Sequence, residues 1–247
     1  FQIYFDFAGY SHIAIGSALT MGIKFRENFN FPYHSISPKI FWKNWHISLS
    51  SWVRDYIYLP LLKIKSVNNS EGGFDKYLDH QNLKFYTIIT LFITWSLMGL
   101  WHGASWNFVL WGIWNFLVIL LFRLIKKLFN KNNYFENIIS WFISLNLIML
   151  GWIFFRSENL DLSFQMLSNL LYFKNWTFLS LRENTYLVAF FVTFFYLISP
   201  VIIKIFKFIS IKYKLIADFI LAISIALSLI LILIYNQEVN QFIYFQF

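Results

Sequence analysis

The fold is decided by the stretch Leu97-Met98-Gly99-Leu100-Trp101-His102-Gly103-Ala104-Ser105-Trp106. It places one ionisable side chain, His102, between two apolar runs at Phe85–Leu100 and Trp106–Leu121. Each run is about long enough to cross, or nearly cross, a bilayer core of ~30 Å. The pattern therefore predicts two membrane helices that form a hairpin with the histidine at its tip.

His102 has two interpretations. A histidine at membrane depth is costly, so such residues usually face a cavity or the bundle interior and mark function. Alternatively, His102 lies at a wet hairpin tip and caps backbone groups. Gly99, Gly103 and Ala104 favour the functional interpretation, because small residues let backbones approach closely and leave room beside an imidazole.

The bulk composition is that of a membrane protein. The 247 residues are 58% hydrophobic, 23% aromatic and 13% charged, and the mean hydropathy is +0.56. A soluble chain of this length could bury a core, but it would not carry so many long apolar runs with so few charges. The chain contains no cysteine, which excludes a thiolate nucleophile, a disulfide and a cysteine metal site. The sequence has no metal-ligand spacing either, so we expect no metal.

The net charge of +8 could indicate a nucleic-acid partner, but the basic residues flank apolar spans instead of forming a stripe. We therefore expect no nucleic acid, and a lipid bilayer around the chain. Basic residues cluster at 123–131 and 204–214, which the positive-inside rule assigns to the cytoplasm. Residues 156–183, the tail from Asn236 and the hairpin tip at His102 are then expected to face outward.

A second chemically rich segment covers Phe41–Pro60, where charges interrupt an aromatic pattern. The pattern predicts one amphipathic helix at the membrane interface that ends at Pro60. Arg54 and Asp55 are expected to form a structural ion pair near the lipid headgroups. Helical spacing gives this helix two faces, one with Trp42, Trp45, Leu49 and Trp52, and the other with His46, Ser50 and Val53.

Outside these segments, apolar spans alternate with polar loops. Pro200 should kink one span, and Asp161 is expected to be the N-cap of a short amphipathic helix at 162–173. The predicted fold class is all-α, a polytopic transmembrane helix bundle with interfacial amphipathic helices. The expected loops are 24–38 and 63–84, and the expected further spans are 138–155, 186–203 and 215–235.

The hairpin stretch also resembles a known motif. Gly99–Trp106, Gly-Leu-Trp-His-Gly-Ala-Ser-Trp, is similar to the active-site motif of the membrane-bound O-acyltransferase family, in the bacterial branch typified by alginate O-acetyltransferase. Phe41–Pro60 is a second match, and Phe5–Ser11 with Ala14–Gly16 is a third, so the resemblance covers nearly the whole chain. His12 departs from the family pattern, because relatives usually carry an aspartate at this position.

The resemblance implies a multi-pass protein of the bacterial cytoplasmic (inner) membrane. It implies acetyl-CoA as the acyl donor, entering from the cytoplasm, and a cell-envelope polysaccharide as the final acceptor. That acceptor would be reached through an extracytoplasmic partner, an SGNH-type acetyltransferase or esterase-like protein. Because the chain begins inside an apolar run at Phe1, we expect residues 1–247 to be the C-terminal part of a single membrane-embedded acyltransferase domain whose first spans are missing.

Acyl transfer from a thioester needs a base and a site that keeps water away. Histidine suits the base, since its unperturbed pKa of ~6.5 leaves it largely neutral at neutral pH, and His102 is the candidate. The resemblance places His46 in the reaction chamber, where it would orient a group or stabilise the developing oxyanion; alternatively it is an interfacial hydrogen-bonding residue. The residues that bind CoA are not indicated. Some lysines could meet its phosphates but fit positive-inside flanks better, namely Lys39, Lys43, Lys63 and Lys65.

The tail 242–247 contains Tyr244, which again has two interpretations. It resembles a C-terminal tyrosine motif proposed to carry the acyl group in envelope acyltransferases, which would make Tyr244 an acyl relay. Alternatively, the tail is an aromatic anchor at the membrane interface, a role that Trp and Tyr commonly have.

Two other functions stay open at this point. Within the same family, the acyl group could be D-alanine from a carrier protein, destined for teichoic acid. From another class, the chain could be a polytopic transporter or scaffold whose buried histidines relay protons or hold helices together. The sequence does not indicate which polymer is modified.

Overall fold

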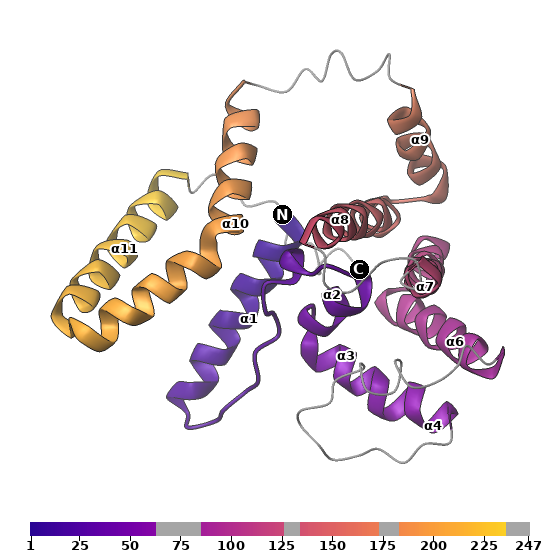
Figure 1. Cartoon of the computed structure of the whole chain (residues 1–247), viewed down its shortest axis with the longest axis horizontal. Helices are drawn as coiled ribbons and strands as arrows, with labels where there is room; N and C mark the ends of the chain where they lie inside the picture. The colour runs from indigo at the N-terminus through magenta and orange to yellow at the C-terminus, as the bar shows by residue number, and fades with distance from the viewer. Residues whose placement is uncertain (63–84, 126–133, 173–182, 236–247) are drawn as a thin grey trace. The chain divides into compact units, whose positions relative to one another are not determined.

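The computed structural model describes residues 1–62, 85–125, 134–172 and 183–235, which form helices and short connections with no strand among them. Contacts divide the chain into two compact units, Phe1–Trp176 and Thr177–Gln246. Figure 1 labels the helices of both units. The predicted all-α class is confirmed for the described residues.

The predicted hairpin forms from α6 (Phe85–His102) and α7 (Trp106–Ile125), joined by a turn of three residues. The two helices approach closely because both contact surfaces carry glycine. A Cβ atom on Gly99 would collide with the carbonyl oxygen of Phe108, and one on Gly112 with the carbonyl oxygen of Trp95. Small residues are what allow such backbone approach between membrane helices.

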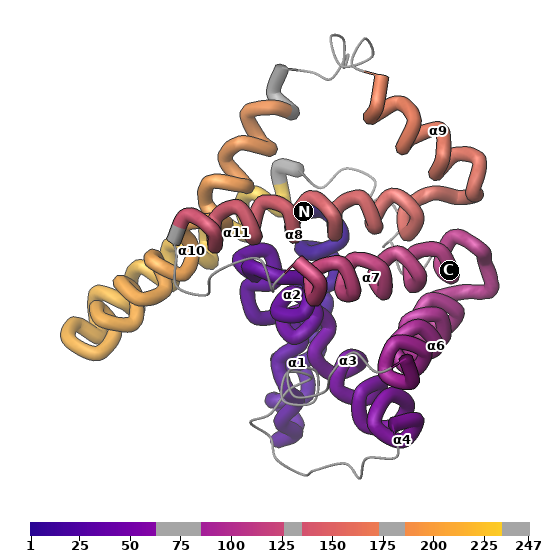
Figure 2. Tube along the Cα trace, turned by 45° about the vertical axis from the view of Figure 1, so that its right-hand side comes forward, coloured from indigo at the N-terminus to yellow at the C-terminus, as the bar shows by residue number. Residues whose placement is uncertain are grey.

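Helix α8 (Tyr134–Arg156) contains the span predicted at 138–155 and runs beside α7 (Figure 2). Trp114 Nε1 on α7 donates to the carbonyl oxygen of Leu147 on α8 at 2.7 Å. At the end of the pair, Asn107 Nδ2 donates to the carbonyl oxygen of Ser157 at 2.6 Å. The hairpin and α8 are therefore tied together at two levels along their length.

The prediction of one helix over Phe41–Pro60 is wrong. The structure has α2 (Pro38–Asn44) and α3 (Ile47–Val53), separated at His46, whose backbone is left-handed with φ 45° and ψ 56°. Because the break rotates α3 relative to α2, the tryptophans do not share one face. Trp42 is buried and donates from Nε1 to Oδ1 of Asn115 at 3.2 Å, whereas 51% of Trp52 is exposed.

The predicted helix end at Pro60 is confirmed to within one residue, since α4 (Leu59–Leu61) ends at Leu61. The chain continues from α3 through a π-helical turn at Arg54–Tyr58 into α4, with Pro60 in its first turn. A proline lacks the N–H that an α-helix needs and its ring clashes with the carbonyl of the preceding turn. The wider π-helical turn changes that hydrogen-bond register, so Pro60 is accommodated and the helix ends one residue after it.

Helix α1 (Gln2–Thr20) packs against the connection that follows it. The predicted loop 24–38 is confirmed, with one short 3-10 turn at Pro32–His34 inside it. Phe29 in this loop lies between α1 and the end of α2, with ring centroids 5.0 Å from Phe7 and 5.1 Å from Trp45. The loop is thus held by aromatic packing.

The short helix predicted at 162–173 is α9 (Leu160–Leu171), but its N-cap is Asn159 and not Asp161. Asn159 Oδ1 accepts a hydrogen bond from the backbone N–H of Leu162 at 2.8 Å. Asp161 lies inside the first turn, where its negative charge suits the positive end of the helix dipole. Both residue types favour helix starts, so the sequence left the boundary two residues uncertain.

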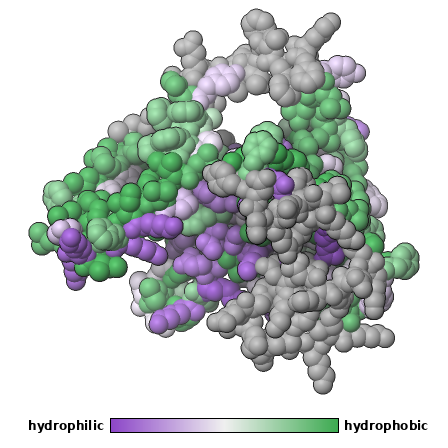
Figure 3. Space-filling view, viewed as in Figure 1, coloured by the Kyte–Doolittle hydropathy of each residue, from purple (hydrophilic) through white to green (hydrophobic). Residues whose placement is uncertain are grey.

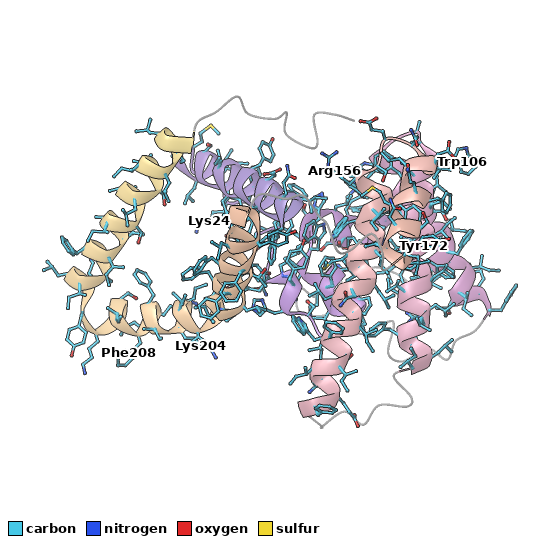
Figure 4. The ribbon with its side chains drawn as sticks, turned by 90° about the horizontal axis from the view of Figure 1, so that it is seen from above. Lys24, Trp106, Arg156, Tyr172, Lys204 and Phe208 are labelled. Carbon is cyan, nitrogen blue, oxygen red and sulfur yellow. The ribbon has the colours of Figure 1, made fainter. Side chains whose placement is uncertain are left out.

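The second unit consists of α10 (Glu183–Lys212) and α11 (Lys214–Tyr235). Pro200 lies inside α10, and Figure 1 shows that this helix changes direction about midway. On the face seen in Figure 3, apolar side chains cover most of both helices. Helix α10 continues well beyond the predicted span, so Lys204 lies on its second half (Figure 4) and not in a loop.

Five described helices are long and apolar enough to cross a membrane, namely α6, α7 and α8 in the first unit and α10 and α11 in the second. Trp106 at the start of α7 and Arg156 at the end of α8 lie at the same end of that pair (Figure 4). The predicted number and order of spans from residue 85 onward are confirmed.

Candidate active site

His102 is the last residue of α6, and aromatic rings from three helices surround its imidazole. The ring centroids of Trp101 and Phe155 lie 4.9 and 5.0 Å away. Those of Trp111 and Phe108 lie 5.1 and 6.2 Å away. His102 is therefore half-buried in an aromatic cage, although it stands at the hairpin tip.

The cage forms because the turn after His102 carries almost no side-chain volume. A Cβ atom on Gly103 would come within 2.6 Å of the Phe108 ring. Phe108 and Trp111 are three residues apart on α7, so one helix face presents both rings. Phe155 comes from α8, and sequence reasoning missed it, because no local pattern indicates which residue of another helix reaches the hairpin.

His46 lies at the start of α3, where its left-handed backbone turns the side chain out of the helical register. Its ring meets the Phe7 ring of α1 edge-on at 4.7 Å, and its Nδ1 lies 3.4 Å from Ser48 Oγ. Burial lowers the pKa of His46 to about 4, because the charged form loses solvation. The imidazole is therefore neutral at neutral pH.

A polar network supports this segment from the loop before α2. Asn28 Oδ1 accepts from Ser48 Oγ at 2.7 Å and from the backbone N–H of Ser48 at 3.1 Å. The backbone oxygen of Asn28 accepts from the N–H of Ile47 at 2.9 Å. Asn28 Nδ2 in turn lies 3.4 Å from Ser11 Oγ on α1. Sequence reasoning missed Asn28, because it lies in a polar loop without a motif.

The structure brings the two predicted histidines to the same aromatic side chain. The ring centroid of Trp101 lies 6.4 Å from that of His46 and 4.9 Å from that of His102. Trp101 itself is largely exposed, with 60% of its surface accessible. Two imidazoles from separate segments, flanking one indole, can together bind and deprotonate a hydroxyl group.

The other predicted residues lie apart from this arrangement or outside the described residues. His12 is exposed, with Nδ1 3.7 Å from Glu27 Oε2. Arg54 and Asp55 form the expected pair, at 2.7 and 2.8 Å. Tyr244, Lys63 and Lys65 fall outside the described residues, and Lys39 and Lys43 lie on α2. Within the described part of the chain, no three His, Asp or Glu residues come close enough to hold a metal ion.

Comparison of the sequence with known proteins identifies its family. The model of the membrane-bound O-acyltransferase family matches residues 1–72, which include His46. A protein of Azotobacter vinelandii named "Probable alginate O-acetylase AlgI" is 39% identical over 182 residues, covering 74% of this chain and 33% of that protein. The peptidoglycan O-acetyltransferase of Helicobacter pylori is 33% identical over 171 residues, covering 69% and 29%.

A third relative is the teichoic acid D-alanyltransferase of Bacillus subtilis, 30% identical over 165 residues, covering 63% of this chain and 38% of that protein. The chain thus spans about a third of the length of the curated relatives it matches. The similarity and the five apolar helices identify an integral membrane protein. The chain belongs to the membrane-bound O-acyltransferase family.

Proposed function

We propose that this chain forms part of an O-acyltransferase that moves an acetyl group from cytoplasmic acetyl-CoA toward hydroxyls of an extracytoplasmic cell-envelope polysaccharide. The observation that carries the proposal is the convergence of His46 and His102 on Trp101. The names of the relatives from Azotobacter and Helicobacter favour acetyl transfer to an envelope polymer. The bacterial inner membrane follows from this assignment.

In the proposed step, His102 is the general base. It takes the proton of the acceptor hydroxyl while the hydroxyl oxygen attacks the thioester carbonyl. The carbon–sulfur bond then breaks, the acetyl group stays on the oxygen, and the proton passes from His102 to the CoA thiolate. The sulfur keeps the electron pair of the broken bond and gains the hydroxyl proton, so the step needs no further reactant. His102 returns to its neutral form.

The aromatic cage protects this step from water. Phe155 and Trp111 cover the imidazole from α8 and α7, so water has little access to the base. A thioester that met water at the same base would hydrolyse, and exclusion of water prevents such side reactions. His46 is neutral as well, and it would orient the acceptor or stabilise the oxyanion.

The acetyl group would continue to the polymer through the tail and a partner. Tyr244 is the proposed relay and an SGNH-type extracytoplasmic protein the proposed partner. The support for Tyr244 is chemical, since phenols ionise near pH 10 and alkyl hydroxyls far above that value. An acetyl ester on a phenol is therefore more reactive than one on an alkyl alcohol. In the alternative, Tyr244 anchors the tail at the membrane interface and takes no part in the transfer.

The test is removal of His102 in the full-length protein. Loss of a general base typically costs 10²–10⁴-fold, so His102→Ala should bring polymer acetylation close to background while the protein stays membrane-inserted. Slow hydrolysis of acetyl-CoA by the purified protein should fall in parallel. A stably inserted variant with normal acetylation would overturn the assignment of His102.

D-alanyl transfer is the second candidate, favoured by the similarity to the Bacillus relative. The two donors separate the candidates, because acetyl-CoA and a D-alanyl thioester of a carrier protein can be supplied one at a time. Acetyl turnover that depends on His102 supports the first. Turnover of the D-alanyl donor alone supports the second, and turnover of neither donor supports a transporter or scaffold.

A further inference from the structure

The hydrogen bonds behind His46 can be assigned a direction. The backbone N–H of Ser48 lies 3.1 Å from the side-chain oxygen of Asn28. A backbone N–H can only donate, so this contact requires the oxygen of the Asn28 amide, and not its nitrogen, to face Ser48. The amide nitrogen then faces Ser11 Oγ at 3.4 Å. Asn28 thus presents an acceptor to Ser48.

The single hydroxyl proton of Ser48 is drawn to this acceptor. Ser48 Oγ lies 2.7 Å from Asn28 Oδ1 and 3.4 Å from His46 Nδ1. An amide oxygen cannot donate, so the shorter contact holds the Ser48 proton. Toward His46, the hydroxyl oxygen can then only accept. A hydrogen bond between them requires a proton on Nδ1 of His46.

We propose that Ser48 and Asn28 are positioning residues that hold His46 with its proton on Nδ1, so that Nε2 of His46 accepts a hydrogen bond from the substrate. Since burial keeps the ring neutral, with a pKa of about 4, His46 carries a single N–H. A neutral imidazole protonated on Nδ1 has a lone pair at Nε2 and no proton to donate there.

The proposed function leaves His46 two roles, to orient the acceptor or to stabilise the oxyanion. If that function holds, the tautomer decides between them. Stabilising an oxyanion needs a donor, which Nε2 cannot be in this state. Orienting the acceptor needs only a lone pair. The group that His46 recognises is then a neutral hydrogen-bond donor beside the hydroxyl that His102 deprotonates. The tautomer itself does not depend on the proposed function.

The same loop residue also supports the backbone, and the two effects can be separated. His46 has a left-handed backbone, and the backbone oxygen of Asn28 accepts from the N–H of the next residue, Ile47, at 2.9 Å. Asn28→Ala keeps that backbone oxygen and removes only the side-chain amide. Ser48 would then be free to donate its proton to Nδ1 of His46.

Nitrogen-15 NMR of the full-length protein with labelled histidine tests the tautomer directly. The resonances of His46 are those that disappear in His46→Asn, a variant whose side chain tolerates the left-handed backbone. We expect a protonated Nδ1 and an unprotonated Nε2 in the native protein. In Asn28→Ala the proton should move to Nε2. A protonated Nε2 in the native protein, or an unchanged tautomer in Asn28→Ala, would overturn the proposal.

Matched variants on the same helix complete the test. Ser50 Oγ donates to the carbonyl oxygen of Trp45 at 3.1 Å, so Ser50→Ala removes a nearby hydroxyl outside the network and should leave the tautomer and the turnover unchanged. Ser48→Ala and Asn28→Ala should lower turnover by about 10–100-fold, the range known for partners that orient metal-bound histidines.

Ser48→Thr keeps the hydroxyl and should restore both the tautomer and the turnover. Equal losses in Ser48→Thr and Ser48→Ala would assign Ser48 a packing role and overturn the proposal. If His102→Ala keeps both the native tautomer of His46 and normal turnover, the result contradicts the proposed function. It leaves the assigned hydrogen bonds of Asn28, Ser48 and His46 unaffected. The two failures are therefore distinguishable.

Discussion

The imidazole of His102 meets the ring of Phe155 nearly at right angles, with centroids 5.0 Å apart and planes at 81°. The two residues come from the ends of α6 and α8, which are joined through α7. Phe155 is also buried against Trp111 and Phe108, at 5.3 Å from each. The Phe155 ring thus forms one wall of the aromatic cage and connects the cage to α8.

Phe155→Leu should therefore impair transfer more than folding. Leucine keeps an apolar side chain in the helix but leaves one wall of the cage open, and a shift of ~1 Å in a reacting group can cost up to 10²-fold in rate. We expect polymer acetylation to fall toward that limit while acetyl-CoA hydrolysis falls less, as water enters. Phe142→Leu, at an exposed position of α8, is the control. Equal losses of both activities would argue against a water-excluding role.

Gly99→Ala tests the close approach of α6 and α7. The new methyl group would collide with the carbonyl oxygen of Phe108, so the helices must separate, and overpacking of this kind typically costs about 1–3 kcal/mol. Thermal unfolding in detergent should show a lower midpoint. Gly16→Ala on α1, where a Cβ atom has nothing described within 4 Å, should leave the midpoint unchanged or raise it. Similar midpoints for the two variants would contradict the packing argument.

The membrane spans were predictable because each is a long apolar run, and a bilayer leaves few alternatives to a helix. The break at His46 was not. The sequence Asn44-Trp45-His46-Ile47 has no glycine or proline. The left-handed residue His46 is held because the backbone N–H groups of Ile47 and Ser48 donate hydrogen bonds to Asn28, a tertiary effect that overrides local helix preference. Periodicity cannot detect such a contact.

Part of the candidate site could likewise be predicted from the sequence, and part could not. His102 stands out in the sequence, because an ionisable residue is rare in apolar surroundings, and His46 was indicated by the family resemblance of its segment. Their neighbours do not stand out. Phe155 and Phe7 are ordinary aromatic residues in a chain that is 23% aromatic, so only the folded structure separates the rings that contact a histidine from the rest. The two histidines could be singled out from the sequence, and the aromatic rings that surround them could not.

Burial of His46 makes stability depend on pH. Its pKa is lowered from 6.5 to about 4, so the unfolded chain binds a proton between these values that the folded protein does not. The contribution is fully present above pH ~6.5 and is lost as pH falls toward 4, by up to about 3 kcal/mol before solvent screening. The difference in unfolding midpoint between the native protein and His46→Asn should shrink or reverse over this interval. Parallel midpoints at every pH would mean that His46 is not buried as described.

Tyr244 provides the last prediction, and its basis is the acidity of a phenol. Full proton transfer from tyrosine, pKa ~10, to a histidine of ~6.5 costs about 5 kcal/mol. An alkyl hydroxyl resembling water, pKa ~15.7, would cost roughly 12 kcal/mol. By the same measure phenolate is the better leaving group, so an acetyl ester on Tyr244 would stay activated for a second transfer to a partner.

Tyr244→Phe keeps the aromatic ring and removes only the hydroxyl, so it separates an acyl relay from an aromatic anchor. We expect the variant to insert normally and to hydrolyse acetyl-CoA through His102 at the native rate. Acetylation of the polymer should be abolished, because the acetyl group has no phenol to carry it. The measurement is acetyl content of the envelope polymer beside acetyl-CoA turnover of the purified protein. Full polymer acetylation in Tyr244→Phe would leave Tyr244 as an anchor, and the acetyl group would then pass from CoA to its acceptor without this relay.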